Sequence, residues 1–225
     1  MNDTQLFRLE NVYFSSSTTM LLKDISLSIQ KGDIVELTGE SGQGKSLLLK
    51  VIGGILLPSE GNVYFEGKNL LEMSEGEERD FRKKVAMVFQ DSALWANQNI
   101  LQNLTLPLKV HFPKLNKEEV KQKISDVLDT VQFDKDLALR PAELSLGEQK
   151  KIAFARAMIC SPQVLLLDEC TASLDTSAAK LIRRLLKKFV KQGNTIIYIS
   201  HSATFKREFA GKRITISHGR IENEV

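Results

Sequence analysis

Residues 39–46 read Gly39-Glu40-Ser41-Gly42-Gln43-Gly44-Lys45-Ser46 and match the pattern G-x-x-x-x-G-K-[ST] at every fixed position. A triphosphate needs backbone N–H groups close around its oxygens, and glycine permits that approach. A short strand at 34–38 and a helix at 47–57 are expected to flank the segment, so that the positive end of the helix dipole faces the same anion. We expect the whole segment to contact the nucleotide, with Lys45 at the β- and γ-phosphates and Ser46 on Mg²⁺.

A pair of acidic residues, Asp168 and Glu169, follows the apolar run 164–167. Such a run is typical of a strand buried on both faces of a parallel sheet. It would bring both acids to the carboxyl edge of the sheet, where open α/β sheets bind ligands. We expect Asp168 to hold Mg²⁺ through water and Glu169 to polarise the attacking water. Alone, the pair could equally be a helix cap; beside the 39–46 segment it indicates phosphoryl transfer.

The remaining patterns predict the order of the elements. Alternating or apolar runs predict strands at 5–14, 22–29, 62–65, 85–89 and 195–199, with a polar turn at 15–19. Helical spacing of apolar residues predicts helices at 118–131 and 145–160. We therefore expect one α/β domain, 1–225, with a phosphate-loop core at 1–90 and 161–225. A helical insert is expected at about 91–160, and an antiparallel β portion at the N-terminus.

Composition excludes several classes of protein. Of the 225 residues, 42% are hydrophobic and the net charge is +3, which is too small an excess to predict nucleic-acid binding. Cys160 and Cys170 are too few for a disulfide framework, so we expect reduced thiols. The first ten residues lack the apolar core of a signal peptide, and no run approaches the roughly 20 apolar residues of a membrane span. We expect a cytosolic protein that reaches a membrane only through a partner.

The segment Leu144-Ser145-Leu146-Gly147-Glu148-Gln149 is similar to L-S-G-G-[QE], the signature of ATP-binding-cassette (ABC) ATPases. Its Ser145 and Glu148 form a capping box that opens a helix. The free N–H groups and the dipole at such a helix start favour a phosphate. The resemblance extends over about residues 6–222. It implies that Ser145, Gly147 and Glu148 contact the nucleotide held by a second subunit.

Three more positions match this family in order along the chain. Gln90 stands where the family has a glutamine that senses Mg²⁺ and water, and His201 where it has the histidine that contacts the γ-phosphate. Ser173-Leu174-Asp175 resembles the loop that crosses the dimer interface. The resemblance therefore implies Lys45, Gln90, Glu169 and His201 as catalytic residues.

The same resemblance implies the working assembly. Two ATP molecules, each with Mg²⁺, would join two copies of this chain or one copy and a related ATPase, and hydrolysis would open the dimer. Membrane-spanning permease subunits would be the partners, with no nucleic acid. The chain would then be cytoplasmic and peripheral at the inner face of the cell membrane.

Two departures from the family pattern bear on the nucleotide. Leu146 stands where the family usually has glycine, which would loosen ATP-dependent closure. Ser16 stands where an adenine-stacking aromatic residue is expected, five residues after Asn11. Tyr13 and Phe14 read as sheet residues instead. We therefore expect weak selectivity for the base.

The predictions of the membrane partner and of the transported cargo depend on weaker sequence patterns. Residues 91–108 contain Leu94, Trp95, Ile100 and Leu101, which would dock a membrane subunit if exposed or pack in the insert if buried. This stretch, with 71–82, resembles the ATPases of Mce-type bacterial lipid transporters, which makes lipid transport the candidate function. The alternatives are a metal, lipoprotein or other export cassette, or a soluble ABC ATPase outside transport.

Overall fold

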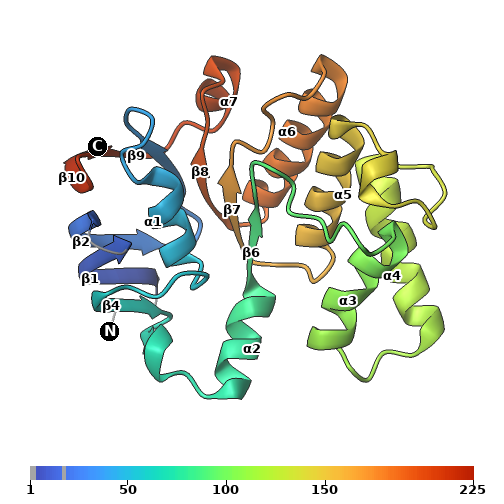
Figure 1. The fold of residues 1–225 in the computed structure, drawn as a ribbon, viewed down its shortest axis with the longest axis horizontal. Helices are drawn as coiled ribbons and strands as arrows, with labels where there is room; N and C mark the ends of the chain where they lie inside the picture. The colour runs from blue at the N-terminus through green and yellow to red at the C-terminus, as the bar shows by residue number, and fades with distance from the viewer. Residues whose placement is uncertain (1–3, 17–18) are drawn as a thin grey trace.

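The computed structural model describes residues 4–16 and 19–225, and within them the strands form two sheets (Figure 1). The antiparallel sheet has the order β2-β1-β4-β5, with strands β1 (Gln5–Ser16), β2 (Thr19–Gln30), β4 (Glu60–Phe65) and β5 (Lys68–Asn69). The second sheet has the order β10-β9-β3-β8-β7-β6, with strands β3 (Ile34–Thr38), β6 (Val85–Val88), β7 (Val164–Asp168), β8 (Thr195–Ile199), β9 (Lys212–Ser217) and β10 (Arg220–Glu224). Its five strands from β9 to β6 pair in parallel, and β10 returns antiparallel to β9.

The unbroken apolar runs lie in the middle of the second sheet because both of its faces are covered. In β7, Leu165 and Leu167 pack with the helical side of the molecule, and Val164 and Leu166 pack with the opposite side. Alternate side chains of a strand point to opposite faces, so each face of the sheet receives half of the run. The carboxyl ends of β3, β6, β7 and β8 then meet at one edge.

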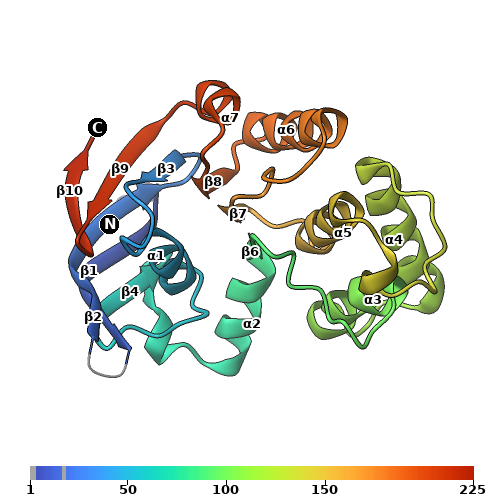
Figure 2. The ribbon, with the colours of Figure 1, turned by 45° about the horizontal axis from the view of Figure 1, so that its top comes forward.

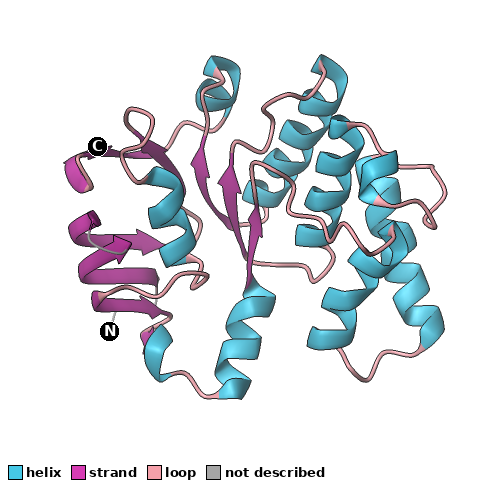
Figure 3. Cartoon of the chain, in the orientation of Figure 1, coloured by secondary structure: helices cyan, strands magenta, loops and turns pink. Residues whose placement is uncertain are grey.

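Helices cover this sheet and form one end of the molecule. They are α1 (Lys45–Ile52), α2 (Glu75–Lys84), α3 (Ile100–His111), α4 (Lys117–Val131), α5 (Leu146–Met158), α6 (Thr176–Lys191) and α7 (Ala203–Glu208), with 3₁₀ turns η1 (Leu70–Glu72) and η2 (Pro141–Glu143). Figures 2 and 3 show α3, α4 and α5 together, away from the strand-rich end. Capping boxes at Asn99, Asn116 and Ser145 start these three helices.

The predicted architecture is confirmed: a phosphate-loop α/β core, an N-terminal antiparallel portion and a helical insertion. Helices α3 to α5 occupy residues 100–158, and the subdomain limits at about 91–160 stay a prediction. No helix among the described residues is both long enough and apolar enough to cross a membrane.

Several predicted boundaries were wrong, and the clearest errors are at one helix and one turn. The helix expected at 47–57 is α1, Lys45–Ile52; it ends early because Gly53 closes it and Gly54 takes a positive φ of 62°. The polar turn expected at 15–19 is mostly strand, with Ser15 paired to Met20 and Ser16 to Thr19. Backbone pairing in a hairpin accepts polar side chains, so polarity alone placed that turn too widely. Residues 17–18 of the predicted turn lie outside the described residues.

Candidate functional site

The loop between β3 and α1 has the close backbone approach that its glycines predict. Gly39, Gly42 and Gly44 have φ values of 135°, 80° and 99°. Within this loop the buried Lys45 ammonium donates to the carbonyl oxygens of Gly39 at 2.9 Å and Glu40 at 2.6 Å. The Lys45 ammonium is therefore held against the backbone of the loop, where phosphate binding requires a cation.

The start of α1 also fits an anion. Gly44 is its N-cap, and within the described residues no side chain caps the helix and its first turn holds no acidic residue. The first N–H groups of a helix have no partner inside the helix, and the dipole adds about half a positive charge at that end. This helix start is therefore suited to phosphate oxygens.

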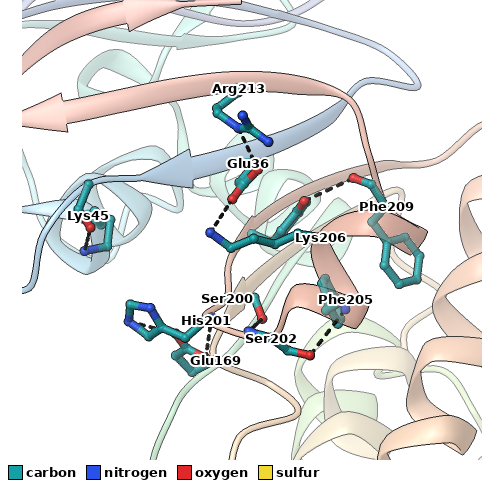
Figure 4. Close-up of polar contacts among 12 residues, drawn as sticks. Glu36, Lys45, Glu169, Ser200, His201, Ser202, Phe205, Lys206, Phe209 and Arg213 are labelled. Carbon is teal, nitrogen blue, oxygen red and sulfur yellow. Dashed lines mark hydrogen bonds and ion pairs between the residues drawn. The ribbon is translucent and has the colours of Figure 1, made fainter.

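Two acidic side chains stand together at the carboxyl end of β7, beside the segment that follows β8. Asp168 is the buried last residue of β7, and Glu169 follows it with a φ of 49°. The Glu169 carboxylate lies 3.4 Å from Nε2 of His201, and the His201 backbone N–H donates to its second oxygen at 3.4 Å (Figure 4). Glu169 is 11% exposed and His201 73% exposed, so the carboxylate is sheltered while the imidazole reaches solvent.

One cavity of about 530 Å³ brings most of these groups together. It is lined by Leu21, Ser41, Gly42, Gly44, Lys45, Ser46, Leu47, Gln90, Asp168, Glu169, Ala172, Ile199 and His201. A second cavity of about 510 Å³ shares Ser46, Gln90 and Asp168 with it and reaches Leu146, Gln149 and Lys150 on α5. Positive groups and acids thus face one space large enough for a nucleotide's phosphates.

The residues present fit a magnesium ion that arrives with a nucleotide. Across residues 4–16 and 19–225, no cluster of three or more His, Cys, Asp or Glu side chains could hold a metal ion. Ser46, Gln90 and Asp168 instead give a hydroxyl, an amide and a single carboxylate. Mg²⁺ is commonly held by one or two carboxylates together with substrate phosphates and water. A metal bound by protein ligands alone would not fit.

Other predicted residues lie outside the first cavity. Gly39, Glu40 and Gln43 belong to the loop but do not line the cavity, and Gln43 accepts from the His218 backbone N–H at 2.5 Å. Asp175 caps α6 by accepting from the backbone N–H groups of Ser177 and Ala178, which lowers the pKa of its carboxyl.

The signature segment forms an exposed helix start. Ser145 and Glu148 form the predicted capping box, with Ser145 Oγ 2.8 Å from the Glu148 carboxylate. Lys135, 2.7 Å away, and Ser145 lower the pKa of Glu148 to about 2, so it is ionised at neutral pH. Leu146 is 66% exposed and Gly147 has no tight neighbour, so this end of α5 is open to a second molecule.

A buried ion cluster fixes the segment that follows His201. The Glu36 carboxylate on β3 is buried, with Lys206 Nζ at 2.8 Å and Arg213 Nε at 3.0 Å (Figure 4). Lys206 lies on α7, and Ser202 caps α7 by accepting from the backbone N–H of Phe205. The cluster therefore ties the helix after His201 to the strand that leads into the phosphate loop.

The base-binding region has no aromatic side chain at the expected place. Ser16 is exposed at the end of β1. Tyr13 and Phe14 are sheet residues, as predicted: Tyr13 pairs with Glu60 of β4, and Phe14 packs against the core. Leu21, which was not among the predicted site residues, also lines the first cavity. A leucine within the apolar run Met20-Leu21-Leu22 of a strand gives no signal of such a role.

The predicted docking stretch is only partly exposed. Trp95 and Leu101 are partly exposed at 42% and 44%, Leu94 is half-buried, and Ile100 is a core residue with no exposure. The Trp95 ring lies 4.9 Å from the Arg156 guanidinium, a cation–π contact. A groove of about 580 Å³ runs along α3 and is lined by Trp95, Asn97, Gln98, Leu101, Gln102, Thr105, Leu106 and Lys109.

Comparison with known proteins agrees with this geometry. The model of the family described as "ABC transporter" matches residues 22–172. The methionine import ATP-binding protein MetN of Francisella tularensis subsp. holarctica (strain OSU18) is 36% identical over 219 residues, 96% of this chain and 62% of the relative. The MetN of Campylobacter jejuni subsp. jejuni is 32% identical, covering 96% of this chain and 69% of the relative. The chain thus spans about two thirds of these relatives or less.

Solved structures give the same fold. The ATP-binding cassette MJ0796, a dimer in a post-hydrolysis state bound to ADP and Pi, has a TM-score of 0.89 at 29% identity, covering 98% of both chains. The cbiO1 protein of Clostridium perfringens, part of the ABC transporter complex cbiONQ, has a TM-score of 0.79 at 27% identity, covering 98% of this chain and 88% of that one. Because the sequence relatives are named for methionine import, the predicted resemblance to lipid-transport ATPases is not supported.

Proposed function

The chain belongs to the ABC transporter family, and on that premise we propose that it hydrolyses ATP, with Mg²⁺, as the motor subunit of a membrane transporter. One observation carries the proposal: Lys45, Ser46, Gln90, Asp168, Glu169 and His201 all line a single cavity. An ammonium group, a hydroxyl and two acids at the carboxyl edge of a parallel sheet are what phosphoryl transfer requires.

The chemistry is positioning and charge neutralisation. Lys45 and the N–H groups of α1 stabilise the charge that spreads over the phosphate oxygens. Glu169, sheltered and acceptor-only when ionised, orients and polarises a water, while His201 reaches from the exposed side toward the terminal phosphate. Magnesium, when bound beside Ser46, Gln90 and Asp168, neutralises further phosphate charge.

A second subunit would complete each site. The start of α5 carries Ser145, Gly147 and Glu148, but these residues do not line the first cavity of their own chain. An exposed helix start is a ready site for a phosphate presented by another molecule. The dimeric neighbour supports this arrangement, in a homodimer or with a related ATPase. Asp175, at the N-terminus of α6, would lie at the same interface.

As the motor subunit of a transporter, the chain would lie at the cytoplasmic face of a membrane, held there by permease subunits. The α3 groove, with Trp95 and Leu101 exposed, supports docking of a short apolar segment of such a subunit. The relatives' names support methionine or a related amino acid as the first cargo to test. We do not propose lipid transport. An export cassette for metal or lipoprotein, or a soluble ABC ATPase, are the alternatives.

Capture of the membrane partner tests the assignment. Tagged Glu169→Gln chain, with ATP present, is recovered from detergent-solubilised cells and its companions are identified by mass spectrometry. A multi-span membrane protein is expected. Leu101→Asp should abolish its recovery, whereas Leu71→Asp should not, because Leu71 is a similarly exposed leucine (49% against 44%) outside the groove. Recovery of only a homodimer, or of ribosomes or DNA, would reject the transport function.

A further inference from the structure

The ammonium group of Lys150 is buried in α5 beside the turn that carries Glu169. Lys150 is only 8% exposed. Its Nζ donates to the carbonyl oxygen of Ala172 and, at 3.3 Å, to that of Glu169. Burying an ammonium is costly unless it is well hydrogen-bonded, and burial lowers the pKa of this one. The buried Lys150 ammonium is therefore positioned to hold the carbonyl groups of Glu169 and Ala172, which flank the turn.

That turn has a conformation that needs external support. Glu169 has a φ of 49°, in the left-handed region that is unfavourable for a residue with a side chain. Its N–H donates to the Ile199 carbonyl at 3.1 Å, and its own carbonyl accepts from the Ala172 N–H at 3.0 Å. Lys150 adds a second donor to that carbonyl from a different element. Sparsely populated backbone conformations persist where the surroundings over-determine them.

The same helix begins at the signature segment. α5 runs from Leu146 to Met158, with Ser145 as its N-cap and Lys150 in its second turn. One end of the helix is therefore open to a second subunit, while its next turn holds the backbone of Glu169. The Glu169 carboxylate lies 3.4 Å from His201, and a shift of the Glu169 backbone would move it from that position.

We propose that Lys150 is a positioning residue that ties α5 to the turn at 169–172, so that the signature segment and the Glu169 carboxylate move as one unit. The inference rests on the proposed function, since it assigns how that site is set. Contact between the signature segment and a partner's nucleotide would then shift the Glu169 carboxylate of the same chain. Lys150 touches neither nucleotide in this scheme.

Matched substitutions test the proposal by kinetics. Lys150→Met removes the ammonium but keeps the length of the side chain, Lys150→Arg keeps a cationic donor, and Lys151→Met makes the same change at the next residue, whose ammonium contacts the Gln132 carbonyl. Misplacing a reacting group by about 1 Å can cost about 100-fold in rate. We expect Lys150→Met to lower kcat at least about tenfold with KM within about threefold. Lys150→Arg should recover much of kcat, and Lys151→Met should match the wild type.

Hydrogen exchange gives a readout that needs no turnover. The Ala172 amide should exchange at least about tenfold faster in Lys150→Met than in Lys151→Met, because the turn has lost an anchor. The proposal would be overturned if kcat of Lys150→Met lay within about twofold of that of Lys151→Met. It would also be overturned if KM of Lys150→Met rose by the same factor by which its kcat fell, or if the exchange rate of the Ala172 amide did not change. If Lys150→Met does not fold, Lys150→Gln takes its place in both measurements. A wild-type chain without ATPase activity would reject the proposed function, while the exchange comparison would still decide the role of Lys150.

Discussion

Alanine at Gly39 should damage the protein far more than alanine at Gly42, although both glycines lie in the phosphate loop with positive φ values of 135° and 80°. At Gly42 nothing lies within 4 Å of an added Cβ. The left-handed conformation costs alanine about 1–2 kcal/mol, and about 0.4–1 kcal/mol is offset by the lower entropy of the unfolded chain. Gly42→Ala should therefore lower the free energy of unfolding by about 1 kcal/mol, or about 2–4 °C in Tm.

At Gly39 a steric clash is added to the backbone strain. Its Cβ would lie 2.2 Å from the carbonyl oxygen of Ile216, where contact normally requires about 3.5 Å. Ile216 is a fully buried residue of β9, so the strand cannot move away without disturbing the core. Forced repacking of a core costs about 1–3 kcal/mol. Gly39→Ala should therefore cost about 3 kcal/mol or more, a loss of about 6–12 °C in Tm.

Urea unfolding followed by circular dichroism, with thermal melts, measures both losses. Gly67→Ala is the control, since Gly67 also has a φ of 80° and nothing within 4 Å of its Cβ, but lies outside the loop. It should match Gly42→Ala in stability and keep wild-type ATP affinity, while Gly42→Ala loses affinity. Equal destabilisation by Gly39→Ala and Gly42→Ala would refute the argument from close approach.

Three further outcomes are expected elsewhere. Lys135 chiefly lowers the pKa of Glu148 from 4.5 to about 2, so the stability that Glu148 contributes is present above pH 4.5 and is lost as the pH falls toward 2. After allowance for solvent screening, Glu148→Gln should cost about 0.5 kcal/mol in urea unfolding at neutral pH and less near pH 3; an equal cost at both would contradict the pairing. Lys206→Met should destabilise more than Glu36→Gln in the same assay, because it leaves a buried carboxylate with one partner fewer, and the opposite order would refute this. Since Ser16 offers no aromatic face to a base, calorimetry should give dissociation constants for ATP and GTP within about threefold; a preference for ATP above about tenfold would exclude weak selectivity.

The buried strands could be predicted because a strand that is buried on both faces has an unbroken run of apolar residues. The run predicted at 34–38 is β3, and that at 195–199 is β8, with the same bounds. The helix predicted at 118–131 differs from α4 by one residue, because its apolar stripe packs against the rest of the core at Ile124, Val127 and Leu128. Periodicity is reliable where one face is buried and the other solvated.

Elements held mainly by single tertiary contacts could not be found this way. The helix α2 buries only Phe81, so its sequence shows charge and no apolar stripe. Arg82 fixes it by donating to the carbonyl oxygens of Gly53 at 2.9 Å and Gly54 at 2.8 Å. The helix α3 was missed for a different reason: it buries Ile100, Leu104 and Leu108, but it contains Pro107, which argues against a helix when only the sequence is read.

Some residues of the candidate site could likewise be predicted from the sequence, and others could not. Lys45, Asp168 and Glu169 could be named because each stands in a segment whose spacing has a chemical reason, and parallel strands bring those segments to one edge. Lys150 could not, since a lysine on a charged helix gives no sign that its ammonium turns inward. The structure places Lys45, Asp168 and Glu169 around one cavity, but the roles of all the site residues stay predictions, and those of Ser145, Gly147 and Asp175 also depend on a second subunit.

If the protein is an ATPase whose two sites form between two chains, Glu169→Gln should trap the closed dimer. Purified wild-type and Glu169→Gln chains are mixed with radiolabelled MgATP, and their mass by light scattering, bound nucleotide and released phosphate are measured together. We expect Glu169→Gln to form a dimer that retains two intact ATP molecules and releases no phosphate, while the wild type releases phosphate and returns to monomer. Phosphate release by Glu169→Gln at the wild-type rate, or ATP bound tightly by a monomer that never dimerises, would contradict it.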